Sequence, residues 1–212
     1  MKYLLWLIWI SIGHRTVRFP VISVQFKDMQ KPAFIITTIA MIVLGALLNP
    51  KAHADIDTCD DLAALEADPM AQSAPVDFED LHAHSVISTC LAALTGPLLK
   101  NRIKEDPDLE ARLFLQLGRG YLAAGDTNNA WAHFNTSADL DYPAGYFALG
   151  VFYLVGEDGE QDLKAAHVAL NHALDGGVIW AARALSMLHL QDDTEFYAPE
   201  KAAYYQSLWA AR

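Results

Sequence analysis

The residues of this sequence that could do chemistry are its two cysteines, its histidines and its clusters of carboxylates. Cys59 and Cys90 are the only cysteines, and neither belongs to a C-x-x-C pair or to a Cys/His spacing that suits zinc. In an oxidising compartment such an isolated pair is expected to form a disulfide, whereas two unpaired thiols are expected only if the chain is not exported. Closing this loop would stabilise the fold by about 3–4 kcal/mol in the chain-entropy model.

The histidines and carboxylates do not form a pattern typical of a catalytic or metal site. His82 and His84 would point about 200° apart on a helix, and His167 and His172 also diverge. The acid-rich stretch of residues 157–162 lacks the alternating ligands and terminal spacing of a calcium loop. We therefore expect no catalytic residues, no metal site and no cofactor.

The N-terminal part has the three regions of a secretory signal. Met29 and Lys31 precede an apolar run over residues 33–48, and Ala52 and Ala54 form a small-x-small cleavage pattern. We interpret residues 1–28 as an upstream extension and residues 29–54 as a signal peptide cleaved near Ala54. The mature protein would be periplasmic or secreted and free of the membrane. The alternative is an uncleaved anchor in the inner membrane, although the apolar run is short for a span of roughly 20 residues.

The predicted mature chain is strongly acidic. Residues 55–212 carry nine Lys/Arg and 25 Asp/Glu, so their formal net charge is −16. An acidic surface repels phosphate backbones, which argues against nucleic-acid binding.

The mature chain divides into two sections, both predicted to be helical. Residues 55–106 show no repeat, with one short helix over residues 60–67 and a longer one over residues 79–94 that Asp77 would cap. The disulfide would join these two helices. Residues 107–211 alternate helical runs with turn signals and contain no alternating β-branched stretch, so the predicted fold is all-α.

Small and aromatic residues recur at matched offsets in residues 107–211. Because a helical hairpin cannot bury its apolar face alone, such units stack. Gly118 and Gly150 would let a partner helix approach closely, with Ala130 and Ala166 facing them. The repeated set is Phe114, Leu117, Gly118, Tyr121, Ala130, Phe134 and Ser137 in the first unit, Tyr146, Leu149, Gly150, Tyr153, Ala166, Leu170 and Ala173 in the second, and Ala182, Leu185, Ser186, His189, Ala202, Gln206 and Trp209 in the third.

These residues resemble the tetratricopeptide superfamily, and the longer second unit resembles a Sel-one-like repeat, with Leu149, Gly150, Tyr153, Gly156 and Asp162 at the expected places. The resemblance implies a short α-solenoid of about three antiparallel hairpins that acts as a protein-interaction scaffold of the exported bacterial type. A cysteine-rich exported branch of the family is linked to β-lactam binding, but its disulfides lie within the repeats, and the cysteines here do not.

The resemblance also predicts a concave groove lined by the first helix of each pair. Its candidate partner-binding residues are Arg112, Arg119, Phe147, Trp180 and Arg183. Three of the six Lys/Arg after residue 110 fall on groove positions, and arginine suits carboxylates, so an acidic or C-terminal peptide is the expected ligand. The alternative is that these arginines form ion pairs with neighbouring acids and that the aromatic residues belong to the core.

We expect from these observations a non-catalytic exported scaffold that binds a peptide or protein. The alternatives are an exported hydrolase or β-lactam-binding enzyme and a membrane-anchored structural subunit. The sequence does not set the oligomeric state.

Overall fold

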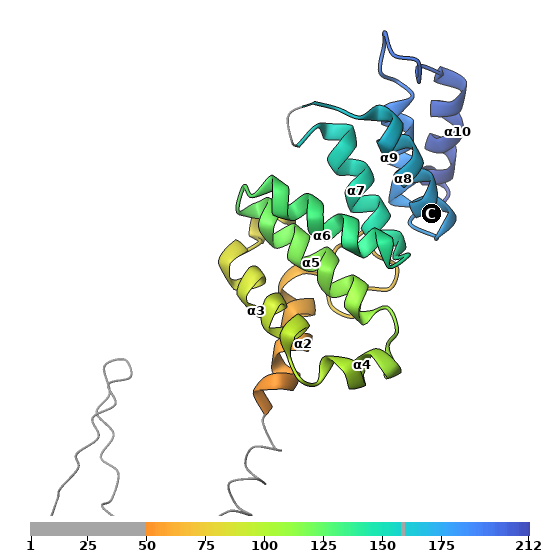
Figure 1. Ribbon diagram of the computed structural model, residues 1–212. Helices are drawn as coiled ribbons and strands as arrows, with labels where there is room; N and C mark the ends of the chain where they lie inside the picture. Colours follow the sequence, from red (N-terminus) through yellow and green to blue (C-terminus); the bar gives the residue numbers. More distant parts are fainter. Residues whose placement is uncertain (1–49, 158–159) are drawn as a thin grey trace, which may run out of the picture. The chain divides into compact units, whose positions relative to one another are not determined.

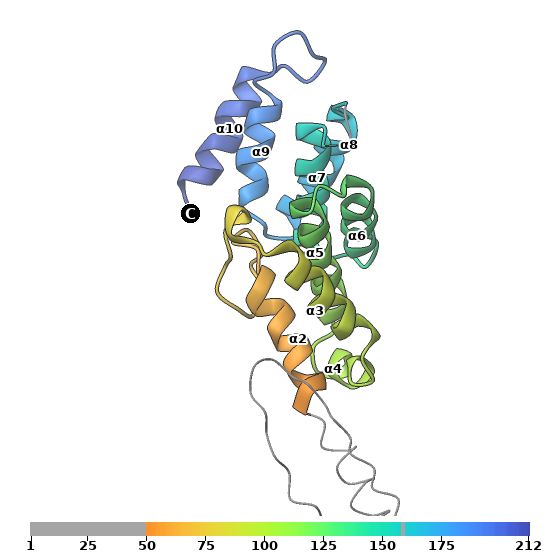
Figure 2. The ribbon, with the colours of Figure 1, turned by 90° about the vertical axis from the view of Figure 1, so that its left-hand side faces the viewer.

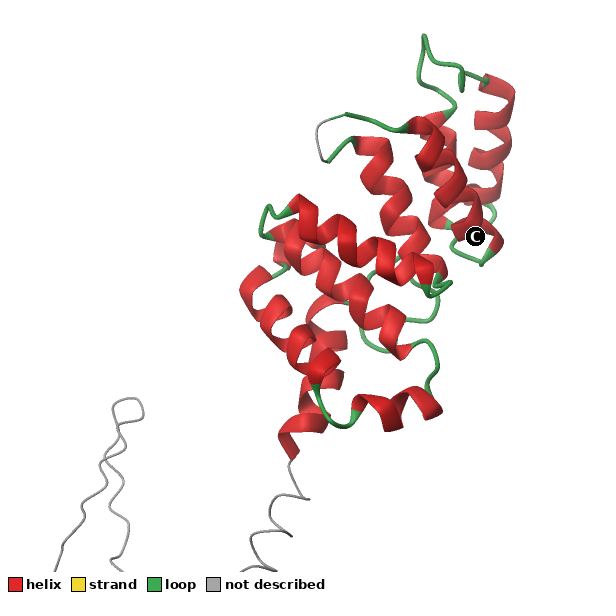
Figure 3. Cartoon of the chain, in the orientation of Figure 1, coloured by secondary structure: helices red, strands yellow, loops and turns green. Residues whose placement is uncertain are grey.

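The computed structural model describes residues 50–157 and 160–212, which fold into α-helices joined by loops (Figures 1 and 3). Within these ranges there are nine α-helices and no strand, so the prediction of an all-α protein is confirmed. The helices are α2 (Pro50–Ala63), α3 (Ala83–Thr95), α4 (Leu99–Glu105), α5 (Leu109–Ala123), α6 (Thr127–Asp139), α7 (Pro143–Val155), α8 (Leu163–Asp175), α9 (Trp180–Leu188) and α10 (Pro199–Ala210), with one 3-10 turn, η2 (Phe78–Asp80).

Helices α5 to α10 pack as three consecutive hairpins, α5–α6, α7–α8 and α9–α10, and each hairpin also contacts the next (Figures 1 and 2). Their limits follow local signals in the sequence. Pro143 and Pro199 each stand at a first helical turn, where the missing N–H is not needed. Asp126 and Asp162 cap α6 and α8, since each carboxylate accepts a hydrogen bond from the backbone N–H three residues later.

The N-terminal section (described residues 50–106) departs from the predicted helices. The first helix ends at Ala63, and residues 65–68 form a turn, so the helix predicted over residues 60–67 was placed too late. The helix predicted over residues 79–94 is interrupted: η2 comes first, and α3 begins only at Ala83 after an extended Leu81. The Asp77 side chain makes no capping hydrogen bond, and α4 was not predicted.

The predicted upstream extension and most of the predicted signal peptide lie outside the described residues. Helix α2 begins at Pro50, ahead of the predicted cleavage point after Ala54. None of the helices in the described ranges combines the length and apolar character that a membrane crossing requires.

Small residues allow the helices of a hairpin to pack closely. A Cβ on Gly118 would collide with the Phe134 ring, and a Cβ on Gly150 would collide with the Leu170 side chain. The close approach predicted at both glycines is therefore present, but the groups that come closest are Phe134 and Leu170 rather than the side chains of Ala130 and Ala166. Between hairpins, Gly145 at the start of α7 packs against Ser137 and Ala138 of α6.

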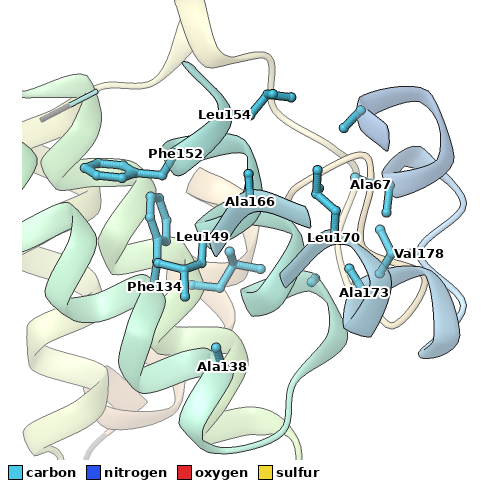
Figure 4. Packing of buried hydrophobic residues seen from close by; sticks show 14 of the residues in the cluster. Ala67, Phe134, Ala138, Leu149, Phe152, Leu154, Ala166, Leu170, Ala173 and Val178 are labelled. Atoms are coloured by element: carbon cyan, nitrogen blue, oxygen red, sulfur yellow. The ribbon is translucent and has the colours of Figure 1, made fainter. Parts of the chain in front are cut away.

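The buried apolar side chains form two clusters. One holds the N-terminal section against α5, through residues such as Val86, Leu113 and Leu117. The other runs through the three hairpins, and within it Phe134 and Phe152 meet edge to face with ring centroids 6.4 Å apart (Figure 4). Ala67 of the N-terminal section belongs to this second cluster, so the section contacts the hairpins as well as its own helices.

Candidate functional site

The two cysteines form the predicted disulfide. Cys59 of α2 and Cys90 of α3 are bonded with an S–S distance of 2.05 Å and a Cα–Cα distance of 5.0 Å, and both are fully buried. Their role in the described structure is to join α2 to α3 beside the first hairpin.

Arg112 of α5 lies inside the protein rather than in an open groove. Arg112 is only 2% exposed. Its Nε donates to Asp60 Oδ1 at 3.1 Å, and its Nη2 donates to Asp106 Oδ2 at 2.7 Å. Burial disfavours the charged guanidinium, but hydrogen bonds to Asp106 and Asp60 outweigh this effect and raise the pKa of Arg112. Gln116 completes the group by donating to Asp60 Oδ1 at 2.6 Å.

Arg119 is also internal, with 6% of the residue exposed. Its Nη1 donates to the carbonyl oxygens of Ala63 and Ala64, both at 2.7 Å, and its Nη2 donates to that of Val76 at 2.8 Å. Two of these carbonyls stand at the C-terminal end of α2, where a cation also complements the helix dipole. Burial lowers the pKa of Arg119 to about 10, a decrease that the charge of Asp77 limits.

The prediction that Arg112 and Arg119 face a partner is therefore corrected. Both guanidinium groups already bind the N-terminal section, which covers this side of α5. The alternative interpretation, pairing with acids, holds for Arg112, but its acids include Asp60, which is far away in sequence.

The segment that follows α2 and packs against the hairpin cluster is the inner loop (residues 64–76). Its Leu65, Ala67 and Met70 belong to the same apolar cluster as Ala144 of α7 and Ala181 of α9. Of the five predicted partner-binding residues, Arg112 and Arg119 are thus buried by the chain itself.

A buried carboxylate fixes the tip of the inner loop. Asp68 Oδ2 accepts a hydrogen bond from the Tyr142 hydroxyl at 2.7 Å, and Oδ1 accepts one from the Met70 backbone N–H at 2.9 Å. Burial raises the pKa of the Asp68 carboxyl, and the lowering of the pKa by these two hydrogen bonds offsets that increase only in part. Burial and the neighbouring Asp68 raise the pKa of Tyr142 as well.

The other three predicted groove residues remain closer to solvent. Phe147 and Trp180 are partly buried against the hairpin cluster, and Arg183 is exposed on α9. Trp180 and Arg183 both contact Trp209, and the described contacts place neither of them with Arg112 or Arg119.

Trp180 and Arg183 join Trp209 and Arg212 in what we call the tryptophan–arginine cluster. The two indole rings are 4.7 Å apart, and the guanidinium carbons of Arg183 and Arg212 lie 5.7 Å and 3.5 Å from the centre of the Trp209 ring. No carboxylate in the described ranges forms an ion pair with either arginine. Such stacking leaves the N–H edge of a guanidinium able to bind an anion.

Trp209 and Arg212 were not among the predicted site residues. Trp209 occupies the repeat position that Ser137 and Ala173 hold in the first two hairpins, so a bulky ring stands where the repeat has small residues. This departure from the small-residue pattern, together with Arg212 three positions later, is the feature of the sequence that could have indicated the cluster.

A second surface feature lies over the second hairpin. Tyr146 and Tyr153 of α7 and Val168 and His172 of α8 line a shallow, mainly apolar hollow of about 460 Å³. Trp131 of α6 donates from its indole N–H to the Tyr153 hydroxyl at 2.9 Å.

None of the histidine, cysteine and carboxylate side chains in the described ranges come together in a group of three that could hold a metal ion. The buried polar groups at Arg112, Arg119 and Asp68 all make internal contacts of the kind that stabilise a fold.

Comparison with known proteins gives no further assignment. No protein-family model, no curated protein and no solved structure matches the chain.

Proposed function

We propose that this protein is an exported, non-catalytic interaction module, a short solenoid of the tetratricopeptide and Sel-one-like type that binds a peptide or protein partner. The observation that carries the proposal is the succession of three hairpins packed through small residues at matched positions. Successive units bury apolar side chains against one another, as the units of repeat scaffolds do. The periplasm or the exterior of the cell is the proposed location, which agrees with a buried disulfide.

The binding surface of this module is the part of the groove that the inner loop leaves accessible. It consists of Phe147, Trp180 and Arg183, extended by Trp209 and Arg212. Only four Lys/Arg follow residue 119, against twelve Asp/Glu, and two of the four belong to the tryptophan–arginine cluster. An acidic peptide segment is the partner chemistry that this local positive charge favours.

A peptide titration tests this proposal. An acetylated peptide of glutamates should quench the tryptophan fluorescence of the purified protein, whereas a glutamine peptide of equal length should not. Arg183→Glu should abolish the quenching, and Lys164→Glu on α8 is the matched control because it changes the net charge equally at another exposed site. Equal responses of the two variants would contradict the assigned surface.

Export and catalysis need separate measurements. Mass spectrometry of the protein from the cell envelope should read Asp55 as the first residue, and retention of residues 33–48 would favour the anchored subunit instead. Turnover of a chromogenic β-lactam by the purified protein would contradict the non-catalytic assignment.

A further inference from the structure

Two histidines meet where the third hairpin packs on the second. His167 lies on α8, and His189 directly follows α9; their ring centroids are 5.4 Å apart and their planes are nearly perpendicular. His189 also stacks on Tyr205 of α10, with planes 2° apart, and His167 contacts the Phe196 ring in the loop between α9 and α10. The pair therefore contacts both α10 and the loop that joins α9 to α10.

His189 fastens the loop that leads into α10. Its Nδ1 lies 2.7 Å from the Phe196 carbonyl oxygen, so this nitrogen carries the proton and donates it. Its backbone carbonyl accepts a hydrogen bond from the Ala198 N–H at 3.0 Å, one residue before α10 begins. Both bonds close the loop of residues 190–198 onto the end of α9.

The second ring nitrogen of His189, Nε2, is buried and unpartnered in the described structure. The residue is 1% exposed, and Nε2 has no hydrogen-bond partner in the described structure. A proton added there would create a buried N–H and a buried positive charge without an acceptor, which is costly inside a protein.

The charged groups around the pair do not compensate for such a proton. Neither imidazole forms an ion pair with a described carboxylate. Burial, His189 and Lys201 all lower the pKa of His167, so its folded form takes up a proton less readily than the unfolded chain. The other titratable groups on the neighbouring elements are Tyr205 on α10, Asp175, whose charge acts on Tyr205, and the residues that line a polar hollow together with Phe196, namely Glu160, Asp162, Lys164 and Glu195.

We propose that the His167–His189 contact makes the docking of the third hairpin sensitive to pH, so that acidification releases residues 190–198 and α10 while α5 to α8 stay folded. Since Trp209 lies on α10 and Arg212 follows its C-terminal end, the same opening would disrupt the tryptophan–arginine cluster. The release itself needs no partner and is measurable on the isolated chain.

Hydrogen exchange of the intact protein between pH 7.5 and 5 tests this inference, with rates corrected for intrinsic exchange. For each proton taken up only by the opened form, protection of α10 should fall about tenfold per pH unit below the ordinary imidazole pKa of about 6.5. Protection of α5 and α6 should stay constant. A loss of protection that is equal in all helices, or no loss in α10, would overturn the proposal.

Two phenylalanine variants separate this contact from a general acid effect. His167→Phe keeps a ring against His189 and Phe196 but cannot be protonated. The slope of the logarithm of α10 protection against pH should therefore fall to half or less of its value in the unaltered protein. His172→Phe, on the same helix but exposed and stacked on Tyr146, should respond like the unaltered protein. A response of His167→Phe equal to that of His172→Phe would refute the role of the pair.

An NMR titration of the unaltered protein provides a second readout should His167→Phe not fold. The imidazole signals of His167 and His189 should change together with the amide signals of α10. Protonation of the His167 ring with unchanged α10 amide signals would also overturn the proposal.

Discussion

The N-terminal section is connected to α5 by a disulfide-linked helix pair and by buried charged groups, whereas the hairpins contact one another through glycine, serine, alanine and apolar side chains. In the first region Arg112 and Arg119 reach carboxylates and carbonyls of residues 60–76. In the second region Gly145 lies directly on Ser137 and Ala138. The difference shows that a residue can match the repeat pattern in the sequence while its contacts are determined by another segment that packs over it.

The largest effect should come from removing a buried charge partner. Arg112→Ala would leave Asp60 buried without its cation, which typically costs about 3–5 kcal/mol of unfolding free energy. Arg183→Ala removes an arginine from an exposed site and should cost less than about 1 kcal/mol. Urea unfolding of both variants measures the contrast, and similar small losses would show that the buried charges do not hold the N-terminal section.

The disulfide should contribute the next largest effect. Replacing Cys59 and Cys90 together by alanine should lower the unfolding free energy by about 2–5 kcal/mol, because the unfolded chain regains its freedom. Since the chain has no other cysteine, unfolding the unaltered protein with a reductant is the matched control and should reproduce the loss. An unchanged midpoint in both experiments would argue against a stabilising role.

Close packing within the hairpins should give a smaller effect. Gly118→Ala and Gly150→Ala each introduce a Cβ that collides with Phe134 or Leu170, and we expect losses of about 1–3 kcal/mol. Ser186→Ala, at the equivalent position of the third hairpin, adds no atom and serves as the control. If alanine instead stabilises α5 and α7, as it does in an unhindered helix, Phe134 and Leu170 do not approach these glycines closely.

Asp68→Asn should have the smallest effect on the free energy of unfolding at neutral pH. Its main consequence should be a change in how that free energy depends on pH. Burial raises the pKa of Asp68 above its ordinary 3.8, so the stability that its protonation provides is present at low pH and is lost as the pH rises through the folded value. Asparagine does not titrate. The unfolding free energy of the Asp68→Asn variant, measured between pH 4 and 7, should therefore lack this loss. Asp192→Asn, in an exposed loop, should show the same dependence of stability on pH as the unaltered protein. Parallel dependences for all three proteins would contradict the raised pKa of Asp68.

The hairpins could be predicted because their signals are local. Pro143, Gly125 and the pair Gly176 and Gly177 mark helix limits within a few residues of where they act. Gly125, Gly156 and Gly177 have positive φ angles of 76°, 77° and 91° at the turns, a conformation that glycine adopts readily.

The candidate site was harder to predict because it depends on contacts between distant residues. The repeat pattern places Arg119 on a groove position, but residues 63, 64 and 76 decide whether that position is open. Such a segment has no periodic signature, and α4 and the interruption before α3 were missed for the same reason. The cysteines were an exception, since two isolated thiols leave only one pairing within the chain.

Trp209 has a consequence for attempts to lengthen this protein by design. On α6, the small Ser137 lets the next hairpin approach to the distance that Gly145 requires. On α10, the indole of Trp209 occupies the corresponding position and lies under the guanidinium of Arg212. A further helical hairpin grafted after α10 would therefore need Trp209 replaced by alanine or serine before it could pack as α7 packs on α6.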